Sequence, residues 1–224
     1  MSIAPARSGP GRPPDPDLES RVFAATLDLY AEVGWARFSL DIVARRARVG
    51  KAALYSRWGS KEKLIVAALA QRYEDKPHPD VKIGSVRSEL IIMARLILDD
   101  LLAPDSLVVL RAMVEARVYP EVFGREMERM GRRRTEVGRS IVLRAIARGE
   151  LPQGTSPALI LDAVGGILTN HVLSTPADKL PALADTRDTY TERIVDFVLT
   201  GAHYRPIDID SRTTAPAIAP PRGD

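Results

Sequence analysis

The stretch that decides the fold is Ser39–Lys63, SLDIVARRARVGKAALYSRWGSKEK. It contains two short segments with apolar residues at helical spacing, the first starting at Leu40 and the second ending at Trp58, with a three-residue turn between them. Cations and hydroxyls occupy the positions between the apolar ones. Two short helices joined by a tight turn, with a polar outer face, are typical of a helix-turn-helix that enters the major groove of DNA.

A helix pair this short needs a third helix to cover its apolar side. The segment before it repeats apolar residues at helical spacing, and Asp15 as cap, Pro16 at the first position and Gly34 at the end predict its bounds. Trp35 and Phe38 add aromatic area to the predicted core. The predicted packing positions of the three helices are Leu18, Val22, Ala25, Leu29, Val33, Leu40, Val43, Ala44, Ala47, Leu54 and Trp58.

The other side of the second helix is small, polar and basic, which suits close contact with base edges. Lysine and arginine bond to guanine O6 and N7, small side chains contact the thymine methyl group, and hydroxyls hold phosphates. The helix starts at Ser39 and Ser60 are expected to present backbone N–H groups to phosphates, with the serine hydroxyls as caps and Lys61 beside the second. The predicted DNA contacts on the helix itself are Lys51, Ala52, Ala53, Tyr55, Ser56 and Arg57.

These residues resemble the TetR family of bacterial transcriptional regulators. The resemblance covers about Arg21 to Ala68, and the matching positions are Leu54, Tyr55, Trp58, Ser60, Lys61 and Glu62. It implies an all-α fold, in which an N-terminal three-helix DNA-binding domain with the helix-turn-helix precedes a C-terminal helical bundle for ligand binding and dimerisation.

The sequence departs from the family at three positions of the DNA-binding unit. The family usually has glycine in the turn and serine at the cap of the second helix, where this chain has Arg48 and Gly50. A non-glycine residue at positive φ costs about 1 kcal/mol or more, so Arg48 is either strained or part of a reshaped turn. Ala53 replaces a threonine that often contacts DNA. The resemblance therefore does not predict the operator sequence.

Charge is distributed unevenly along the chain. Residues 1–64 hold 11 Lys and Arg against seven Asp and Glu, a net charge of +4, and the remainder has a net charge of −1. A local basic excess favours phosphate contact, although a solvated surface has the same composition. Residues 1–14 are rich in proline and glycine and are predicted to be a disordered basic arm. Arg12 is expected to enter a minor groove, with a plain flexible terminus as the alternative.

The rest of the chain is predicted to be soluble and helical. We expect the DNA-binding domain over residues 15–73, the ligand-binding and dimerisation domain over 74–201, and a disordered tail over 202–224. The chain has no cysteine, no run approaching the roughly 18 apolar residues of a membrane span and no targeting signal, so a cytoplasmic protein without membrane contact is expected. Three scattered histidines, His78, His171 and His203, do not make a metal set, and no cofactor is expected.

Five helices are predicted after Pro79, at about 86–102, 105–117, 120–148, 157–173 and 188–199. The resemblance implies an effector pocket among the first three. Methionine clusters adapt to varied apolar ligands, although they are more often ordinary core residues. The candidates for the pocket lining are Met93, Leu110, Met113, Arg117, Tyr119, Phe123, Met127 and Met130.

The last two predicted helices resemble the pair with which TetR relatives dimerise. Gly165 and Gly166 lie within a helix, which costs about 1 kcal/mol each and which close approach of a partner backbone explains. An intrachain bundle built from the same apolar residues is the alternative. The predicted interface comprises Ile160, Leu161, Val164, Gly165, Ile167, Leu168, Ile194, Phe197 and Val198.

Together these features predict a homodimeric repressor that binds a palindromic operator and is released by an unidentified small-molecule effector. One alternative is an architectural DNA-binding protein with weak sequence preference and no effector. The other alternative, an enzyme, lacks any arrangement of nucleophile, base and orienting group in the sequence. The chain is therefore expected not to be an enzyme, and its partners to be double-stranded DNA, a second copy and the effector.

Overall fold

The computed structural model describes residues 17–75 and 84–202, and these contain helices and no strand, which confirms the all-α prediction. The predictions for the arm with Arg12, for Asp15 and Pro16, for His78 and His203, and for the tail from 203 lie outside these residues. The elements are α1 (Leu18–Val33), η1 (Trp35–Arg37), α2 (Leu40–Ala47), α3 (Lys51–Trp58), α4 (Lys61–Glu74), α5 (Val86–Leu102), α6 (Ser106–Glu115), η2 (Pro120–Gly124), α7 (Arg125–Ala147), α8 (Pro157–Ser174), η3 (Ala177–Lys179), α9 (Leu180–Asp185) and α10 (Arg187–Ala202).

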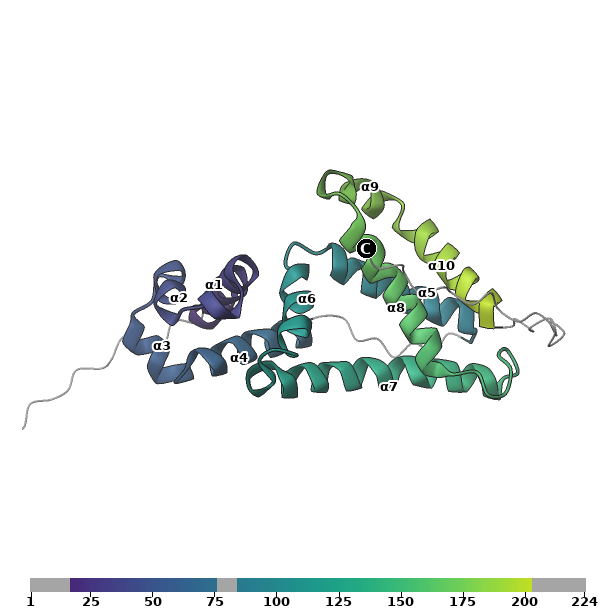
Figure 1. The fold of residues 1–224 in the computed structure, drawn as a ribbon, viewed down its shortest axis with the longest axis horizontal. Helices are drawn as coiled ribbons and strands as arrows, with labels where there is room; N and C mark the ends of the chain where they lie inside the picture. Colours follow the sequence, from purple (N-terminus) through teal and green to yellow (C-terminus); the bar gives the residue numbers. More distant parts are fainter. Residues whose placement is uncertain (1–16, 76–83, 203–224) are drawn as a thin grey trace, which may run out of the picture.

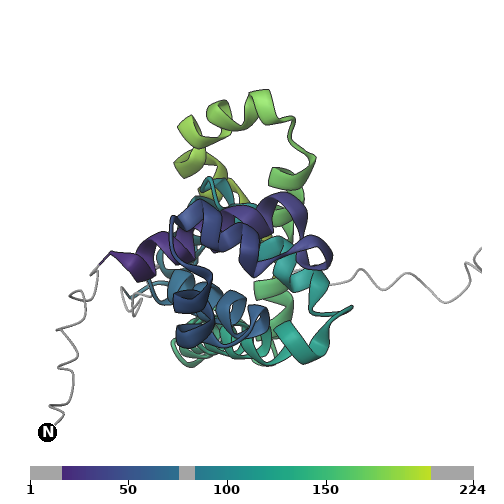
Figure 2. The ribbon, with the colours of Figure 1, turned by 90° about the vertical axis from the view of Figure 1, so that its left-hand side faces the viewer.

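The molecule is elongated, with α1–α3 at one end and the helices from α5 onward at the other (Figure 1). Helix α4 runs from the tip beside α3 toward α7 and packs on α1 and α7. The segment of η3 and α9 projects beyond the other helices in both views (Figures 1 and 2). Helix α4 therefore contacts both the N-terminal helices and the C-terminal part of the chain.

The predicted helical spacing places the expected residues in the N-terminal core. Trp35 and Phe38 are buried as predicted, whereas Leu18, Val33 and Trp58 lie at the edge of the core and are only partly buried. The predicted positions that are buried are Val22, Ala25, Leu29, Leu40, Val43, Ala44, Ala47 and Leu54. Phe23 and Tyr30 of α1 are also buried and were not predicted, because they flank the stripe that the helical period picks out.

This core continues into the C-terminal part of the chain. Val108 and Ala112 of α6 and Phe123 of η2 belong to it. The Phe123 ring centroid lies 5.6 Å from that of Tyr30 and 5.5 Å from that of Trp35, so an aromatic cluster joins the two parts. The boundary predicted at residue 73 therefore does not separate two independent cores.

Polar contacts hold α6 to the N-terminal helices at both ends. At its C-terminal end, the Glu115 carboxylate accepts hydrogen bonds from the Tyr30 hydroxyl at 2.7 Å and from the Trp35 backbone N–H at 3.2 Å. Burial and the neighbouring Glu115 carboxylate raise the pKa of Tyr30, so this hydroxyl keeps its proton. At the other end, buried Arg72 of α4 donates to Asp105, directly before α6, at 2.5 Å.

The C-terminal core is formed by α5, α7, α8 and α10, which pack against one another. Gly138 of α7 marks the crossing with α8, because a Cβ atom there would lie 2.3 Å from Leu161 Cδ2. The largest fully buried aliphatic side chains of the C-terminal core are Leu90, Leu98, Ile141 and Leu168.

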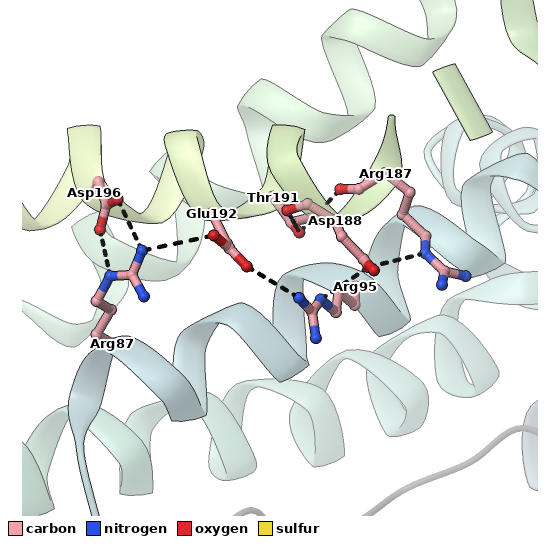
Figure 3. A network of polar contacts seen from close by, with 7 residues as sticks. All are labelled: Arg87, Arg95, Arg187, Asp188, Thr191, Glu192 and Asp196. Atoms are coloured by element: carbon pink, nitrogen blue, oxygen red, sulfur yellow. Dashed lines mark hydrogen bonds and ion pairs between the residues drawn. The ribbon is translucent and has the colours of Figure 1, made fainter. Parts of the chain in front are cut away.

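Ion pairs connect the outer faces of α5 and α10 (Figure 3). Arg87 donates to Asp196 at 2.7 Å, and Arg95 lies 3.2 Å from Glu192 and 3.1 Å from Asp188. The three carboxylates are spaced by four residues on α10, so they face α5 on successive turns. Pairs this exposed contribute little stability individually, but together they fix the register of α10 on α5.

Several predicted helix bounds need correction. Helix α1 begins at Leu18, with Asp17 as its N-cap residue. The long helix predicted from Pro120 begins as a π-helical turn over Pro120–Gly124 and becomes α-helical at Arg125. The short helices η3 and α9 were not predicted because Pro176 and Pro181 interrupt the helical period there.

Candidate nucleic-acid interface

Helix α3 presents the face that the sequence predicted for DNA. Leu54 is 1% exposed and anchors the helix, while Trp58 lies half-buried with its ring centroid 5.9 Å from that of Phe23. Figure 1 shows α3 at the far end of the molecule, where it is open to a partner. The exposed residues are Lys51, Ala52, Ala53, Tyr55, Ser56 and Arg57, the six predicted to contact DNA on this helix.

The turn before α3 depends on Arg48, which has φ 57° and ψ 45° in the left-handed region. The Val49 N–H donates to the Ala44 carbonyl at 2.9 Å, which ends α2. Gly50 then takes an extended conformation as the cap of α3. Of the two possibilities for Arg48, the structure therefore has the strained residue, which lies in the left-handed region.

Both cations of α3 form ion pairs with neighbouring helices. Lys51 Nζ lies 2.6 Å from Asp41 Oδ2 in the first turn of α2, and Arg57 is paired with Glu19 in the first turn of α1. The Arg57 guanidinium also lies 5.4 Å from the centroid of the Trp58 ring. Both cations on the face predicted to contact DNA are therefore paired within the chain.

The two predicted phosphate sites at helix starts differ. The Ser60 hydroxyl accepts from the Lys63 N–H at 3.3 Å and caps α4, as predicted. Ser39 precedes α2 but its hydroxyl makes no capping hydrogen bond, which corrects the expectation of a hydroxyl cap there. Lys61 Nζ lies 4.1 Å from the centroid of the Trp35 ring, which holds the cation beside the start of α4.

The residues predicted to line an effector pocket do not converge. Met93 is buried in the C-terminal core and Phe123 in the N-terminal one. Met113 is 48% exposed and Arg117 is exposed as well. The remaining candidates are Met130, which is buried, Tyr119 and Met127, which pack on the N-terminal core, and Leu110, which is partly exposed. The helical spacing of Phe123 does not distinguish a pocket lining from a contact between two parts of the chain, and in the structure Phe123 packs on Tyr30 and Trp35.

The residues of the predicted dimer interface divide between the core of the chain and its surface. Five of its residues fill the core of their own chain, as in the intrachain alternative: Ile160, Val164, Leu168, Ile194 and Val198. Leu161, Gly165 and Ile167 are partly buried, and Phe197 is 72% exposed. Leu159 and Leu173, which were not predicted, also lie open on α8. Helix α8 has apolar residues on every side, and this feature of the sequence could have identified Leu159 and Leu173.

Helix α8 bears on the expectation that the chain makes no membrane contact. Within the described residues, it is the one helix long and apolar enough to cross a membrane by length and composition alone. It packs on α5, α7 and α10, so one side of it is covered by its own chain.

The described residues contain no group of three or more His, Asp or Glu side chains that could hold a metal ion. His171 instead packs on Tyr190, with ring centroids 4.5 Å apart.

The comparisons with known proteins cover both ends of the chain. Residues 22–68 match the bacterial regulatory proteins of the tetR family, and residues 81–198 match the tetracyclin repressor-like C-terminal domain. The HTH-type transcriptional regulator AqdR of Rhodococcus erythropolis is 30% identical over 156 residues, which are 69% of this chain and 74% of AqdR. The DNA-binding transcriptional repressor TetR of Mycobacteroides abscessus is 29% identical over 185 residues, 80% of this chain and 90% of that protein.

A solved structure has the same fold. MexZ, described as a key repressor responsible for antibiotic resistance in Pseudomonas aeruginosa, superposes with a TM-score of 0.71 at 17% sequence identity, covering 86% of this chain and 98% of that chain.

Proposed function

Because this chain belongs to the TetR family of bacterial transcriptional regulators, which are DNA-binding proteins and not enzymes, we propose that it is a cytoplasmic repressor with a palindromic operator. It binds the operator as a homodimer, and a small-molecule effector releases it. The observation that carries the proposal is the face of α3, where Lys51, Tyr55 and Arg57 stand exposed around buried Leu54. The names of the repressors in Mycobacteroides abscessus and Pseudomonas aeruginosa support repression rather than activation.

DNA recognition in this proposal uses α3 in the major groove. Arg57 and Lys51 donate to guanine, the methyl groups of Ala52 and Ala53 contact thymine, and Tyr55 and Ser56 hold phosphates. Lys61 and the capped start of α4 bind the flanking backbone. Ser39 takes part through the backbone N–H groups at the start of α2.

Dimerisation uses the open side of α8 and α10. Leu159 and Leu173 of α8 and Phe197 of α10 leave a large apolar surface in a single chain, and partly buried Leu161 and Ile167 border it. A Cβ atom at Gly165 or Gly166 would meet nothing within 4 Å, so the fold of one chain does not require glycine there. Both features fit a partner helix that packs against α8.

Effector release requires a ligand that binds one arrangement of the two heads better than the other. Helix α6 suits the transmission of such a preference, because it is tied to α1 through Glu115 and to α4 through Asp105 and Arg72. The match of residues 81–198 to the tetracyclin repressor-like domain supports an effector in this part of the chain.

Selection from a random duplex library tests the proposal directly. We expect the wild-type protein to enrich a palindrome with half-sites about one helical turn of DNA, or a multiple of it, apart, and to bind it as two protomers. The double variant Lys51→Ala and Arg57→Ala should lose this binding. The matched control, Arg132→Ala and Arg134→Ala on the exposed face of α7, removes the same charge and should retain it. Enrichment of no sequence favours the architectural alternative.

Two further measurements test the dimer and the effector. Phe197→Glu and Leu159→Glu should each give monomers in sedimentation, whereas Leu107→Glu, which is also exposed but lies on α6, should not.

A compound that binds the protein should weaken operator binding by the same factor by which the operator weakens the binding of that compound. Unchanged operator affinity with every binder would contradict effector control.

A further inference from the structure

Every cation of the recognition helix is already paired within the protein. Lys51 and Arg57 are the two charged residues of α3, and their partners Asp41 and Glu19 come from the first turns of α2 and α1. Between 44% and 63% of each of these four side chains is exposed. Helix α3 together with its two partner carboxylates therefore carries no net charge toward DNA.

Other cations of the same domain lack such partners. Arg37, Arg45 and Arg48 are exposed, and none of them forms an ion pair within the described residues. Arg46, at the end of α2, is paired with Glu32 at 2.7 Å. Pairing is thus selective, and it includes both side chains that are expected to reach base edges.

Stability does not explain the pairs of α3, because ion pairs this exposed contribute little to folding. Their effect on DNA binding is larger. Affinity for a duplex of any sequence comes mainly from cations that contact phosphates and release counterions. A paired lysine or arginine must leave its carboxylate to make that contact, and the carboxylate then faces the phosphates alone. Non-specific contact through α3 therefore carries a penalty that a free cation would not have.

We propose that Glu19 and Asp41 are specificity-determining residues that suppress the binding of α3 to DNA of arbitrary sequence. At the operator, guanine offers a cation two acceptors, O6 and N7, which compensate for the broken pair. A lone phosphate contact compensates less. This inference rests on the proposed function, in which α3 reads DNA.

Fluorescence anisotropy with a labelled random-sequence duplex and with the duplex selected by the wild-type protein tests the proposal over a series of salt concentrations. Glu19→Gln and Asp41→Asn should each bind the random duplex about three- to tenfold more tightly at low salt, and the slope of log K against log salt should steepen by about 0.9 for each freed cation. Affinity for the selected duplex should rise less, so that the ratio of the two affinities falls.

Two controls separate this effect from overall charge and from folding. Asp99→Asn changes the net charge by the same amount in the C-terminal bundle, where Asp99 lies 2.7 Å from Arg187, and should change the ratio little. Asp41→Glu keeps the charge and should restore wild-type behaviour, and thermal unfolding verifies that each variant is folded. Unchanged or weaker binding to random DNA, or an equal gain on both duplexes, would overturn the proposal. A wild-type protein that selects no sequence would overturn the proposed function instead, while the salt series would still show whether the carboxylates restrain α3.

Discussion

Arg48 is the one residue other than glycine with positive φ in the described part of the chain. Its side chain is exposed and forms no ion pair within the described residues, so its conformation rather than its contacts determines its effect on stability. We predict that Arg48→Gly increases the free energy of unfolding by about 1 kcal/mol, because glycine takes the left-handed conformation without steric cost. Urea denaturation followed by circular dichroism measures this change.

The matched control is Arg45→Gly, which places glycine at an exposed helical position of α2. This variant should lower the free energy of unfolding by about 1 kcal/mol, because glycine is a poor helix former. If the two substitutions had the same sign, the left-handed strain at Arg48 would not be the cause.

Single residues also show how far sequence reasoning reached. Helical spacing predicted that Leu54 is buried and that its neighbours on α3 are exposed. This prediction was possible because α3 is short and packs on the N-terminal core with one side only. Phe123 has the same spacing signal as a pocket residue, yet it packs on Tyr30 and Trp35. That contact joins residues far apart in the chain, and a local period carries no information about it. The carboxylate partners of Lys51 and Arg57 were missed for the same reason.

At the scale of elements, the crossing of α7 and α8 depends on Gly138. We predict that Gly138→Ala lowers the free energy of unfolding by about 1–3 kcal/mol, because the new Cβ would lie 2.3 Å from Leu161 Cδ2 and 3.2 Å from Leu161 Cγ, so the Leu161 side chain would have to move out of its packed position. Gly131→Ala is the matched control in the same helix, where a Cβ meets nothing within 4 Å. It should be neutral or stabilising by up to about 1 kcal/mol, since alanine is the better helix former. Chemical denaturation of both variants would contradict the prediction if Gly138→Ala were as stable as Gly131→Ala.

The start of α5 depends on an acid at the end of α7. Glu150 accepts a hydrogen bond from the Val86 N–H at 2.6 Å, and this bond, with help from Arg148, holds the pKa of Glu150 below its usual value. A lowered pKa in the folded state means that the stabilisation is present above the unfolded pKa, about 4.3, and is lost as pH falls through the folded pKa. We predict that Glu150→Gln destabilises the protein at pH 7 and that the difference from wild type shrinks toward pH 3.

Urea denaturation at both pH values measures this difference. Glu136→Gln, at an exposed position of α7, should show no comparable difference at either pH. A difference for Glu150→Gln that stayed constant between pH 7 and pH 3 would contradict the assignment, because the ionised carboxylate would then not be what holds Val86.

Elements show the same limit of sequence reasoning. The bounds of α5 were predicted to the residue, because its apolar stripe and its flanking residues agree. The apolar residues of α8 were recognised, but their division between the chain's own core and an open face was not. Ile160 and Leu159 are adjacent and both apolar, yet Ile160 is buried and Leu159 is exposed. Which of the two is buried depends on where α5, α7 and α10 pack against α8.

At the scale of the whole molecule, the two parts of the chain share a core and should unfold together. Both tryptophans, Trp35 and Trp58, lie in the N-terminal part, so their fluorescence reports on that part and on the contact of Trp35 with Phe123, while circular dichroism reports on all helices. Phe123 comes from the C-terminal part and is fully buried against Trp35. We predict that Phe123→Ala lowers the free energy of unfolding by about 3–5 kcal/mol and shifts both signals to a lower denaturant concentration.

Coincident transitions in the wild-type protein are the second part of this prediction, because a shared core makes separate unfolding of the recognition end costly. Met113→Ala, at an exposed apolar position of α6, is the control. The free energy of unfolding from each signal should stay within about 0.5 kcal/mol of wild type. If Phe123→Ala shifted circular dichroism but left the tryptophan transition in place, the N-terminal helices would be stable on their own. In that case α6 and Phe123 would not couple the proposed effector site in the C-terminal bundle to α3, and the proposed effector control would have to act through the proposed dimer instead.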